Sequence, residues 1–316
     1  GILGPDKIAK KFALGLSYVP NANLYAAASR SLEKAKDFSA EMGADKAYGS
    51  YTEMLNDPKV DAVYIATPHV FHYEHTLLCL KHKKPVLCEK PFAMNKNQVK
   101  EMIDFAQKQD TFLMEAMWTH FLPHFKYTKE VIKSGKYGKV LAMEADFGFD
   151  APFNANSRIY NKALGGGSLL DIGIYPIFAA LSFLGKPEKI EATAKMTKTE
   201  VDARCHATFF YPENVKAELY SFVDKHTDVA ATIKLEKAEI YIKPRFHQPS
   251  SVVITTENDS FTKEFGVKAN GYNFEAEHVG QMLLEGKKES TEMSFDKSLE
   301  LIEMLDKVRE KIGLEY

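Results

Sequence analysis

Lys90 stands in the run Cys88-Glu89-Lys90-Pro91, directly after a short apolar segment. Such a segment predicts a buried strand, so the lysine falls at the strand's carboxyl end, where ligands bind in a doubly wound sheet. A partly desolvated ammonium there would hydrogen-bond a substrate hydroxyl and favour the alkoxide that develops as the hydroxyl is oxidised. The alternative is a surface lysine paired with Glu89, and spacing alone leaves both interpretations open.

Asp171 and Tyr175 lie in the largely apolar stretch Leu164–Phe183, which opens with three glycines. The stretch predicts a helix, on which residues four apart share one face. Burying a carboxylate and a phenol on such a helix is costly without partners, so this face is a candidate site. A tyrosine positioned by a lysine is suited to general acid–base catalysis of alcohol oxidation. The alternative is that Tyr175 is an ordinary core aromatic.

The first nine residues place a glycine-containing turn where a first strand should meet a first helix. In a dinucleotide fold this turn is tight, so that the pyrophosphate approaches N–H groups at the helix N-terminus. Gly4 and Ala9 fit the first and third positions of the GxGxxG/A pattern, but Asp6 occupies the second. Its carboxylate is unfavourable beside a pyrophosphate unless the side chain points away. Gly4, Lys7 and Ile8 are the candidate cofactor contacts, and a plain glycine turn is the alternative.

The end of the second predicted strand is Ala28-Ser29-Arg30-Ser31, with Lys34 one helical turn later. NAD-binding chains usually carry an acidic residue here, which accepts hydrogen bonds from the ribose hydroxyls. Arg30 and Lys34 would instead bracket a 2′-phosphate, with Ser29 and Ser31 donating hydrogen bonds. This pattern favours NADP over NAD, and the alternative is a solvated helix start.

The run Thr67-Pro68-His69-Val70-Phe71-His72 follows a third buried strand and is predicted to reach the same ligand-binding edge. His69, His72, His75 and Cys79 recur at helical spacing, but this spacing drifts around the helix and no acidic partner is fixed. We therefore expect no metal site and place His72 near the cofactor. A nucleophilic role for Cys88 would need a nearby base, which the sequence does not identify.

The first 120 or so residues alternate short apolar runs with amphipathic segments, which predicts a doubly wound parallel sheet. The predicted strands are Leu24–Ala28, Ala62–Ile65, Val86–Cys88 and Phe112–Met114. The predicted helices are Leu32–Met42, His72–His82 and Lys96–Lys108.

After Phe121 the pattern changes to strict apolar–polar alternation, which predicts an open, mostly antiparallel sheet with one covered face. Its predicted strands are Val140–Phe149, Ala203–Tyr211, Lys216–Val223, Ala230–Leu235 and Glu239–Ile242. Two amphipathic helices, Phe274–Leu284 and Phe295–Lys311, follow. The predicted fold is thus α/β: a Rossmann dinucleotide-binding domain at 1–120, then a substrate-binding and oligomerisation domain at 121–316. The last helices are expected to pack back on the first domain.

Composition narrows the class of partner. The chain has 316 residues, 45% of them hydrophobic, and a formal net charge of -2. This near-balance argues against nucleic acid as the main partner, because phosphate binding usually leaves a basic excess. No apolar run approaches the roughly 20 uninterrupted residues that span a bilayer, and no signal peptide is visible. Three cysteines without a CxxC pair are typical of a reduced, cytoplasmic protein.

Taken together, the motifs resemble those of the glucose–fructose oxidoreductase/inositol dehydrogenase (Gfo/Idh/MocA) family over essentially the whole chain. They occur in the family's order: Thr67-Pro68-x-x-x-His72, Glu89-Lys90-Pro91, Asp171-x-Gly173-x-Tyr175 and Gly271-Tyr272-x-x-Glu275-Ala276. Within the family, the chain is similar to the dimeric dihydrodiol dehydrogenase branch. The runs that carry this similarity are Ala28-Ser29-Arg30, Met114-Glu115-Ala116-Met117-Trp118-Thr119-x-Phe121 and Asp146-Phe147-Gly148-Phe149.

The resemblance implies NADP use, with Arg30 and Lys34 at the 2′-phosphate, and Lys90 and Tyr175 as the catalytic pair. It implies that Trp118 and Phe147 line the substrate pocket, beside Asp171, and that Arg158 contacts the nicotinamide end. Thr67, Pro68, His72 and Glu89 complete the expected cofactor contacts. Many relatives carry His where this chain has Tyr175. Asp6, and Lys34 in place of the branch's usual Arg, depart from the pattern.

We therefore expect an oxidoreductase that transfers a hydride between NADP(H) and a secondary alcohol of a sugar-like or cyclic diol substrate bound between the domains. One rival is an NAD-dependent sugar or inositol dehydrogenase or aldose reductase. The other is a catalytically silent dinucleotide-binding sensor, although binding alone needs neither Lys90 nor Tyr175. The family's exposed sheet face commonly mediates self-association, so a homodimer or higher homo-oligomer is expected.

Overall fold

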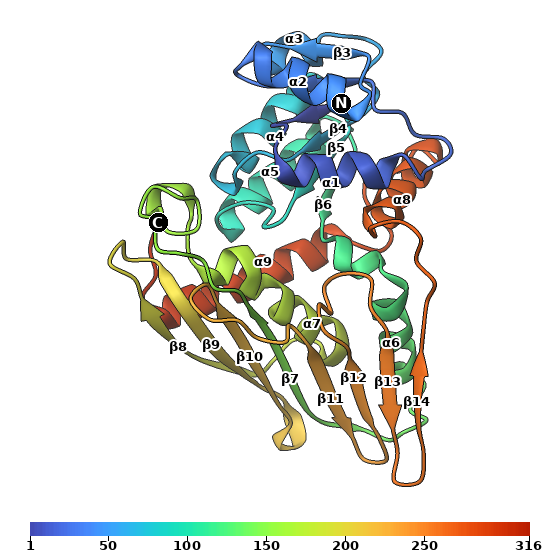
Figure 1. Cartoon of the computed structure of the whole chain (residues 1–316), viewed down its shortest axis with the longest axis vertical. Helices are drawn as coiled ribbons and strands as arrows, with labels where there is room; N and C mark the ends of the chain where they lie inside the picture. Colours follow the sequence, from blue (N-terminus) through green and yellow to red (C-terminus); the bar gives the residue numbers. More distant parts are fainter. The chain divides into compact units, whose positions relative to one another are not determined.

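The chain folds into two units, each built around one β-sheet (Figure 1). A computed structural model describes all 316 residues. Unit 1 comprises Gly1–Trp118 and Val267–Leu299, and unit 2 comprises Thr119–Gly266 and Glu300–Tyr316. Unit 1 holds a parallel sheet and unit 2 a mostly antiparallel one, which confirms the predicted fold class.

The sheet of unit 1 has six parallel strands in the order β3-β2-β1-β4-β5-β6, the order of dinucleotide-binding folds. Its strands are β1 (Ile2–Leu3), β2 (Ala26–Ala28), β3 (Lys46–Tyr48), β4 (Val63–Ile65), β5 (Val86–Glu89) and β6 (Leu113–Ala116). The connecting helices are α1 (Lys7–Leu16), α2 (Leu32–Met42), α3 (Tyr51–Leu55), α4 (His72–Lys81) and α5 (Lys96–Lys108).

Local sequence explains most of these elements. β2 is three alanines with no exposed surface, as expected of a central strand covered on both faces. α2 and α5 have the predicted bounds, because Ser31 and Asn95 cap their first turns by accepting a backbone N–H three residues on. β3 and α3, which are short and only partly buried, were not predicted from the sequence.

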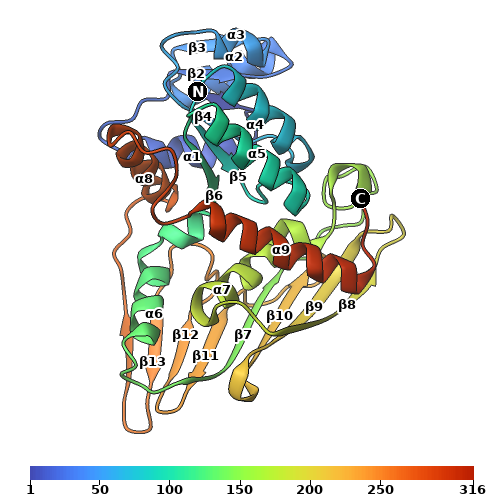
Figure 2. The same ribbon diagram turned by 180° about the vertical axis from the view of Figure 1, so that it is seen from behind.

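The sheet of unit 2 has eight strands in the order β14-β13-β12-β11-β7-β10-β9-β8, of which only β7 and β10 pair in parallel. Its bounds are β7 (Val140–Gly148), β8 (Lys189–Met196), β9 (Asp202–Phe210), β10 (Lys216–Phe222), β11 (Ala231–Leu235), β12 (Glu239–Ile242), β13 (Val252–Thr255) and β14 (Ser260–Lys263). Buried and more exposed residues alternate along β9 and β10. The helices α6 (Pro123–Lys133) and α7 (Ile174–Leu184) lie on one face of the sheet (Figure 2).

The predicted continuous helix Leu164–Phe183 is wrong at its start. A 3-10 turn ends at Leu164, and Gly165 and Gly167 adopt positive φ values of 69° and 113°, which break the helix. Helical structure begins with a π-helical turn, Leu169–Gly173, and continues as α7. Asp171 therefore lies in the π turn, a feature found frequently at functional sites.

The segment Lys162–Leu184 is long and apolar enough to cross a membrane by length and composition alone. However, 78% of its most apolar stretch is buried inside the protein, as in the core helix of a globular domain. Shorter 3-10 turns occur at His69–Phe71, Trp118–Phe121, Lys162–Leu164 and Pro212–Asn214.

Two helices follow the second sheet: α8 (Tyr272–Leu284) and α9 (Phe295–Ile312). α8 belongs to unit 1 and packs on α1, while the boundary between the units falls within α9. Gly15 of α1 makes the α1–α8 contact close, because a Cβ on it would lie 2.6 Å from the Cβ of Tyr272 and 3.0 Å from the backbone nitrogen of Asn273.

Gly15→Ala should therefore destabilise the protein, by about 1–3 kcal/mol, because overpacking against backbone outweighs the gain in helix propensity. Gly280→Ala on α8 is the matched control, since nothing lies within 4 Å of the added Cβ. That variant should be neutral or more stable, by up to about 1 kcal/mol. Urea unfolding midpoints compare the two, and equal midpoints would show that the α1–α8 contact is looser than described.

Candidate active site

The turn after β1 has the geometry of a dinucleotide loop. Gly4 has φ of 79°, and a Cβ on it would lie 2.5 Å from Cγ2 of Thr67, in the loop after β4. Asp6 caps α1, accepting the N–H of Lys7 at 2.8 Å, so its side chain is engaged by its own helix. Ile8 is half-buried in the first turn. Only glycine fits at Gly4, as the sequence pattern requires.

The end of β2 presents two exposed cations, Arg30 and Lys34. The Ser29 hydroxyl accepts the N–H of Ser31 at 3.2 Å, and the Ser31 hydroxyl accepts the N–H of Lys34 at 3.4 Å. Each hydroxyl keeps its own proton to donate. The Arg30 guanidinium carbon lies 5.9 Å from the ring centre of Phe71, within cation–π range. These residues are therefore positioned to meet an anion.

His72 connects the loops that follow β4 and β5. Its ring nitrogens lie 2.8 Å from the carbonyl oxygens of Thr67 and Pro91, and its side chain is 1% exposed. The neighbouring His75 hydrogen-bonds the Thr67 hydroxyl at 2.9 Å, and burial, with the charges of His72 and Arg30, lowers its pKa to about 4. His72 thus holds the Lys90 loop in place through backbone contacts, and its predicted contact with the cofactor stays a prediction.

Lys90 follows β5, half-buried, at the carboxyl edge of the sheet, and its peptide bond to Pro91 is cis. Glu89 is buried and accepts both the Tyr64 hydroxyl and the backbone N–H of Lys90, the latter at 3.1 Å. Burial, and next the charge of Glu89, raises the pKa of Tyr64 well above its ordinary value. Glu89 therefore anchors the backbone of the lysine it precedes.

Glu115 of β6 is a second buried carboxylate near Lys90. It accepts the N–H of Phe92 at 3.1 Å, and burial raises its pKa to about 7, against the opposing effects of the Ser298 hydroxyl and the Lys90 charge. Glu115 was not among the residues predicted for the site. Its signal was present, because Glu115 is the one charged residue in the apolar run Phe112–Met117.

Trp118 is buried in unit 1, where its ring stacks on Tyr272 at 4.2 Å with an interplanar angle of 7°. Phe12 and Tyr64 continue this aromatic packing, with stacked rings 3.7 Å apart. The predicted role of Trp118 in substrate binding is untested by these contacts.

In unit 2, Arg158 and Asp171 form a bidentate ion pair, with both N–O distances 3.0 Å. The Asp171 side chain is 14% exposed, so the pair is well shielded on the carboxylate side. Such fork-to-fork pairs fix geometry as well as charge. Arg158 was predicted to contact the nicotinamide end of the cofactor; in this structure its guanidinium orients Asp171.

Tyr175 is buried in a cluster of three rings. Its ring centre lies 5.6 Å from that of Phe147 on β7 and 5.0 Å from that of His247, in the loop after β12, and the rings of Phe147 and His247 are 4.3 Å apart. The backbone of His247 is fixed by the Thr119 hydroxyl, which donates to its carbonyl at 2.9 Å. His247 was not among the residues predicted for the site. Its one signal was a histidine in a polar loop between strands, in Arg245-Phe246-His247-Gln248-Pro249.

The three cysteines are buried and form no disulfide. Burial raises the pKa of the Cys88 thiol well above its ordinary value, which opposes formation of a thiolate nucleophile. His72 and His75 of α4 hydrogen-bond protein oxygens of Thr67 and Pro91. No group of three or more His, Cys, Asp or Glu side chains has an arrangement suited to a metal ion.

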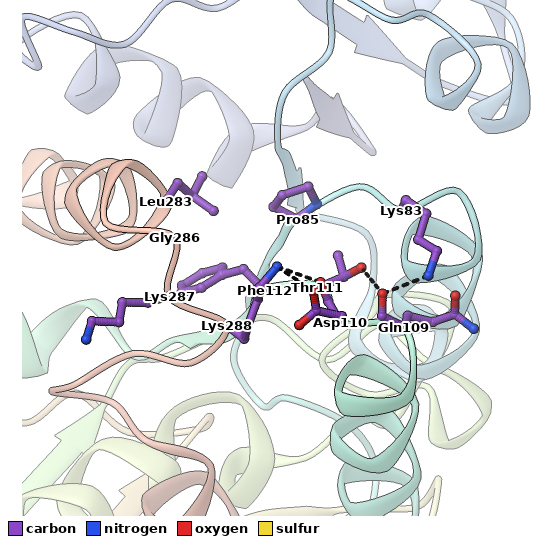
Figure 3. A pocket seen from close by; sticks show the side chains of 10 residues that line it. All are labelled: Lys83, Pro85, Gln109, Asp110, Thr111, Phe112, Leu283, Gly286, Lys287 and Lys288. Atoms are coloured by element: carbon purple, nitrogen blue, oxygen red, sulfur yellow. Dashed lines mark hydrogen bonds and ion pairs between the residues drawn. The ribbon is translucent and has the colours of Figure 1, made fainter.

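A surface pocket of about 460 Å³ in unit 1 lies away from these residues (Figure 3). It is lined by Pro85 and Phe112, which precede β5 and β6, and so sits at the opposite edge of the sheet from Lys90. Lys83 and Lys288, which line it, donate to the carbonyls of Gln109 and Asp110 at 2.8 Å. Ligands of doubly wound sheets bind at the carboxyl edge, so this pocket is not the active-site candidate.

Two family models match the chain. The model described as an oxidoreductase family with an NAD-binding Rossmann fold matches residues 1–117, and the GFO/IDH/MocA C-terminal domain matches residues 125–241. Among characterised proteins, the chain is 36% identical to trans-1,2-dihydrobenzene-1,2-diol dehydrogenase of Xenopus laevis, covering 100% of this chain and 98% of the relative. The human enzyme of the same name is 33% identical over 100% of this chain and 97% of its own.

Solved structures agree. A 3-ketoreductase from Actinomadura kijaniata, crystallised with NADP and TDP-benzene, superposes with a TM-score of 0.89 at 26% identity, covering 99% of this chain and 97% of that one. An aldose-aldose oxidoreductase from Caulobacter crescentus shares the fold, with a TM-score of 0.89 at 23% identity over 99% and 96% of the two chains. The chain therefore belongs to the Gfo/Idh/MocA family of oxidoreductases.

Proposed function

We propose that this enzyme transfers a hydride between NADP(H) and a secondary alcohol of a cyclic diol or sugar-like substrate. The observation that carries the proposal is the pairing of an anchored Lys90 at the ligand-binding edge of a Rossmann sheet with full-length similarity to trans-1,2-dihydrobenzene-1,2-diol dehydrogenases. The 3-ketoreductase relative, crystallised with NADP, supports the same cofactor and a carbonyl substrate.

The residues of unit 1 fit NADP. The turn at Gly4 opens onto the N-terminus of α1, where the backbone N–H groups of Lys7 and Ile8 would meet the pyrophosphate. Arg30 and Lys34, exposed after β2, supply the positive charge that a 2′-phosphate requires, where an NAD-binding chain would carry an acid. When bound, the nicotinamide supplies the hydride donor and acceptor. Thr67, Pro68 and Glu89 would complete the cofactor site.

We assign Lys90 and Tyr175 to the proton transfer. In the oxidative direction the Tyr175 phenolate accepts the substrate's hydroxyl proton, and in the reductive direction the phenol returns it. The Lys90 ammonium would lower the phenol pKa and hydrogen-bond the reacting oxygen. Asp171, held by Arg158, would accept a hydrogen bond from a second substrate hydroxyl, which suits a vicinal diol.

The aromatic rings around Tyr175 favour a cyclic substrate with an apolar face. Phe147 and His247 both lie against the tyrosine ring, so a planar or chair-shaped ring would find flat surfaces beside the reacting hydroxyl. Trp118 remains our further candidate for the substrate-binding surface. A panel of trans-diols, aldoses and inositols, assayed with NADP and NAD by absorbance of the reduced nicotinamide, separates this proposal from an NAD-dependent sugar dehydrogenase or a silent sensor.

We further place the protein in the cytoplasm, since three buried, unpaired cysteines suit a reducing compartment. Imaging of a fluorescent fusion of the full-length protein checks this location, and secretion would contradict it.

Lys90→Met should reduce kcat by at least about a thousandfold, because the transition state loses its positively charged hydrogen-bond donor. NADPH binding, followed by fluorescence titration, should be largely intact. Tyr175→Phe should behave alike. Lys100→Met, which removes an exposed helix lysine paired with Asp104, is the control and should match the parent. Normal turnover in Lys90→Met would rule the catalytic assignment out.

Arg30→Ala should weaken NADPH binding about 10- to 100-fold and leave NADH binding almost unchanged, because only NADPH carries the 2′-phosphate. Lys36→Ala, which changes an exposed lysine on the helix α2 that follows Arg30, is the control. Calorimetric titration with both cofactors measures the change. Equal loss for NADPH and NADH would mean that Arg30 does not read the 2′-phosphate.

We also propose a homodimer formed through the face of the unit 2 sheet opposite α6 and α7 (Figure 2). This face carries half-buried aromatic side chains, with Tyr220 stacked on His206 at 4.4 Å and on Phe222 at 6.2 Å. Tyr220→Arg should shift sedimentation from dimer to monomer, whereas Tyr18→Arg, at an exposed position in unit 1, should not. A parent protein that sediments as a monomer would refute the proposal.

A further inference from the structure

Asp202, the first residue of β9, is a fully buried carboxylate that contacts the segment carrying Asp171. Its Oδ2 atom accepts the Ser168 hydroxyl at 2.6 Å and the backbone N–H of Leu169 at 2.8 Å. Leu169 begins the π-helical turn that contains Asp171. Asp202 thus acts as an N-terminal cap supplied from a neighbouring strand, satisfying an N–H that the helix itself leaves unpaired.

The approach of Asp202 is tight enough to dictate the local sequence. A Cβ on Gly167, whose φ is 113°, would lie 2.1 Å from Oδ1 of Asp202. Ser168 also bonds the Ser221 hydroxyl of β10 at 2.8 Å, and a Cβ on Gly173 would lie 2.9 Å from that same oxygen. Both ends of the turn are therefore held against two adjacent strands.

Burying the Asp202 carboxylate costs free energy, and this cost appears as a raised pKa. Desolvation raises the pKa of Asp202 to about 6, although the Ser168 and Leu169 hydrogen bonds act in the opposite direction. The titratable neighbours that feel its charge are Tyr316, whose hydroxyl donates to Gly166 at 2.6 Å, and Cys205. A buried charge is a poor source of stability, so a cap of this kind contributes chiefly to precise geometry.

We propose that Asp202 is a positioning residue for the reaction: its carboxylate fixes the turn Leu169–Gly173 and, through it, the orientation of Asp171 and Tyr175. The inference rests on the proposed function for its catalytic consequence, but its structural part stands independently of any substrate. Asp202 touches no reacting atom. It acts by setting where the π turn begins and therefore where the side chains that follow it point.

Three variants test the proposal in the full-length protein. Asp202→Ala removes the cap and should lower kcat about a hundredfold, the usual scale for a misplaced catalytic group, with the Kd for NADPH unchanged. Asp202→Asn keeps one acceptor oxygen and should recover most of that loss. Asp224→Asn, another carboxylate of the same sheet that accepts Arg204 at 2.7 Å, is the matched control and should match the parent. Equal kcat values for Asp202→Ala and Asp224→Asn would overturn the proposal.

A second readout needs no turnover. The methyl groups of Ile172 and Ile174, both buried on the segment, should shift in carbon–proton spectra between pH 5 and 7.5 with a midpoint near the Asp202 pKa of about 6. The shift should vanish in Asp202→Asn, which does not ionise, and persist in Asp224→Asn. Shifts that persist in Asp202→Asn would overturn the positioning role. If instead no substrate is turned over but the shifts behave as expected, the proposed function fails and the cap stands.

The raised pKa of Asp202 determines whether the residue stabilises the fold at low or at high pH, and the pH range over which this contribution changes. Because folded Asp202 binds its proton more tightly than an unfolded aspartate, its contribution to stability is full below about pH 4 and is lost as pH rises through about 6. The difference in unfolding free energy between the parent and Asp202→Asn should therefore change across that window and be constant above it. A pH-independent difference would contradict the burial argument.

Discussion

Buried carboxylates that accept backbone N–H groups hold both candidate catalytic segments in place. Glu89 and Glu115 accept N–H groups from residues 90–92 at 3.1 Å, and Asp202 accepts the N–H of Leu169 at 2.8 Å. Each accepting oxygen belongs to a buried carboxylate. Hydrogen bonds to ionised carboxylates are stronger than neutral ones, so they help to hold backbone that lies outside regular strands.

The same bonds explain why titration behaviour is concentrated at these positions. Desolvation raises the pKa of Glu115 to about 7 and that of Asp202 to about 6, because neither carboxylate has a cation as its main partner. The pKa of Glu275 of α8, a residue with no exposed surface, is raised as well, first by burial and then by the charge of Glu89. The protein thus carries acids poised near neutrality beside Lys90 and behind Asp171. The pH dependence of the protein should therefore reflect the titration of these positioning groups as well as that of Tyr175 and Lys90.

The helices and strands that were predicted correctly are those whose sequence patterns are local. α2 and α5 were predicted at their observed bounds from their helical patterns, and in the structure Ser31 and Asn95 cap their starts; β12 was predicted at Glu239–Ile242 because its alternation is regular. β8 and β14 were not predicted because they are edge strands whose residues are mostly solvated, so no clear apolar face distinguishes them. The π turn was not predicted because the extra residue per turn leaves the apolar content of the segment unchanged. The turn depends on contacts with β9 and β10.

The candidate site likewise contains residues with a local sequence signal and residues that only the fold brings together. Gly4, Arg30 and Lys90 were recognisable because each lies at a strand end, and strand order alone assigns those ends to one edge. The ring cluster of Phe147, Tyr175 and His247 comes from a strand, a helix and a loop that together span 100 residues of sequence, and only the folded sheet brings it together. The candidate residues of unit 2 are therefore brought together by long-range packing, whereas Gly4, Arg30 and Lys90 in unit 1 follow from short motifs. The carboxylates that accept N–H groups of the Lys90 loop, Glu89 and Glu115, both belong to unit 1, whereas the whole ring cluster belongs to unit 2.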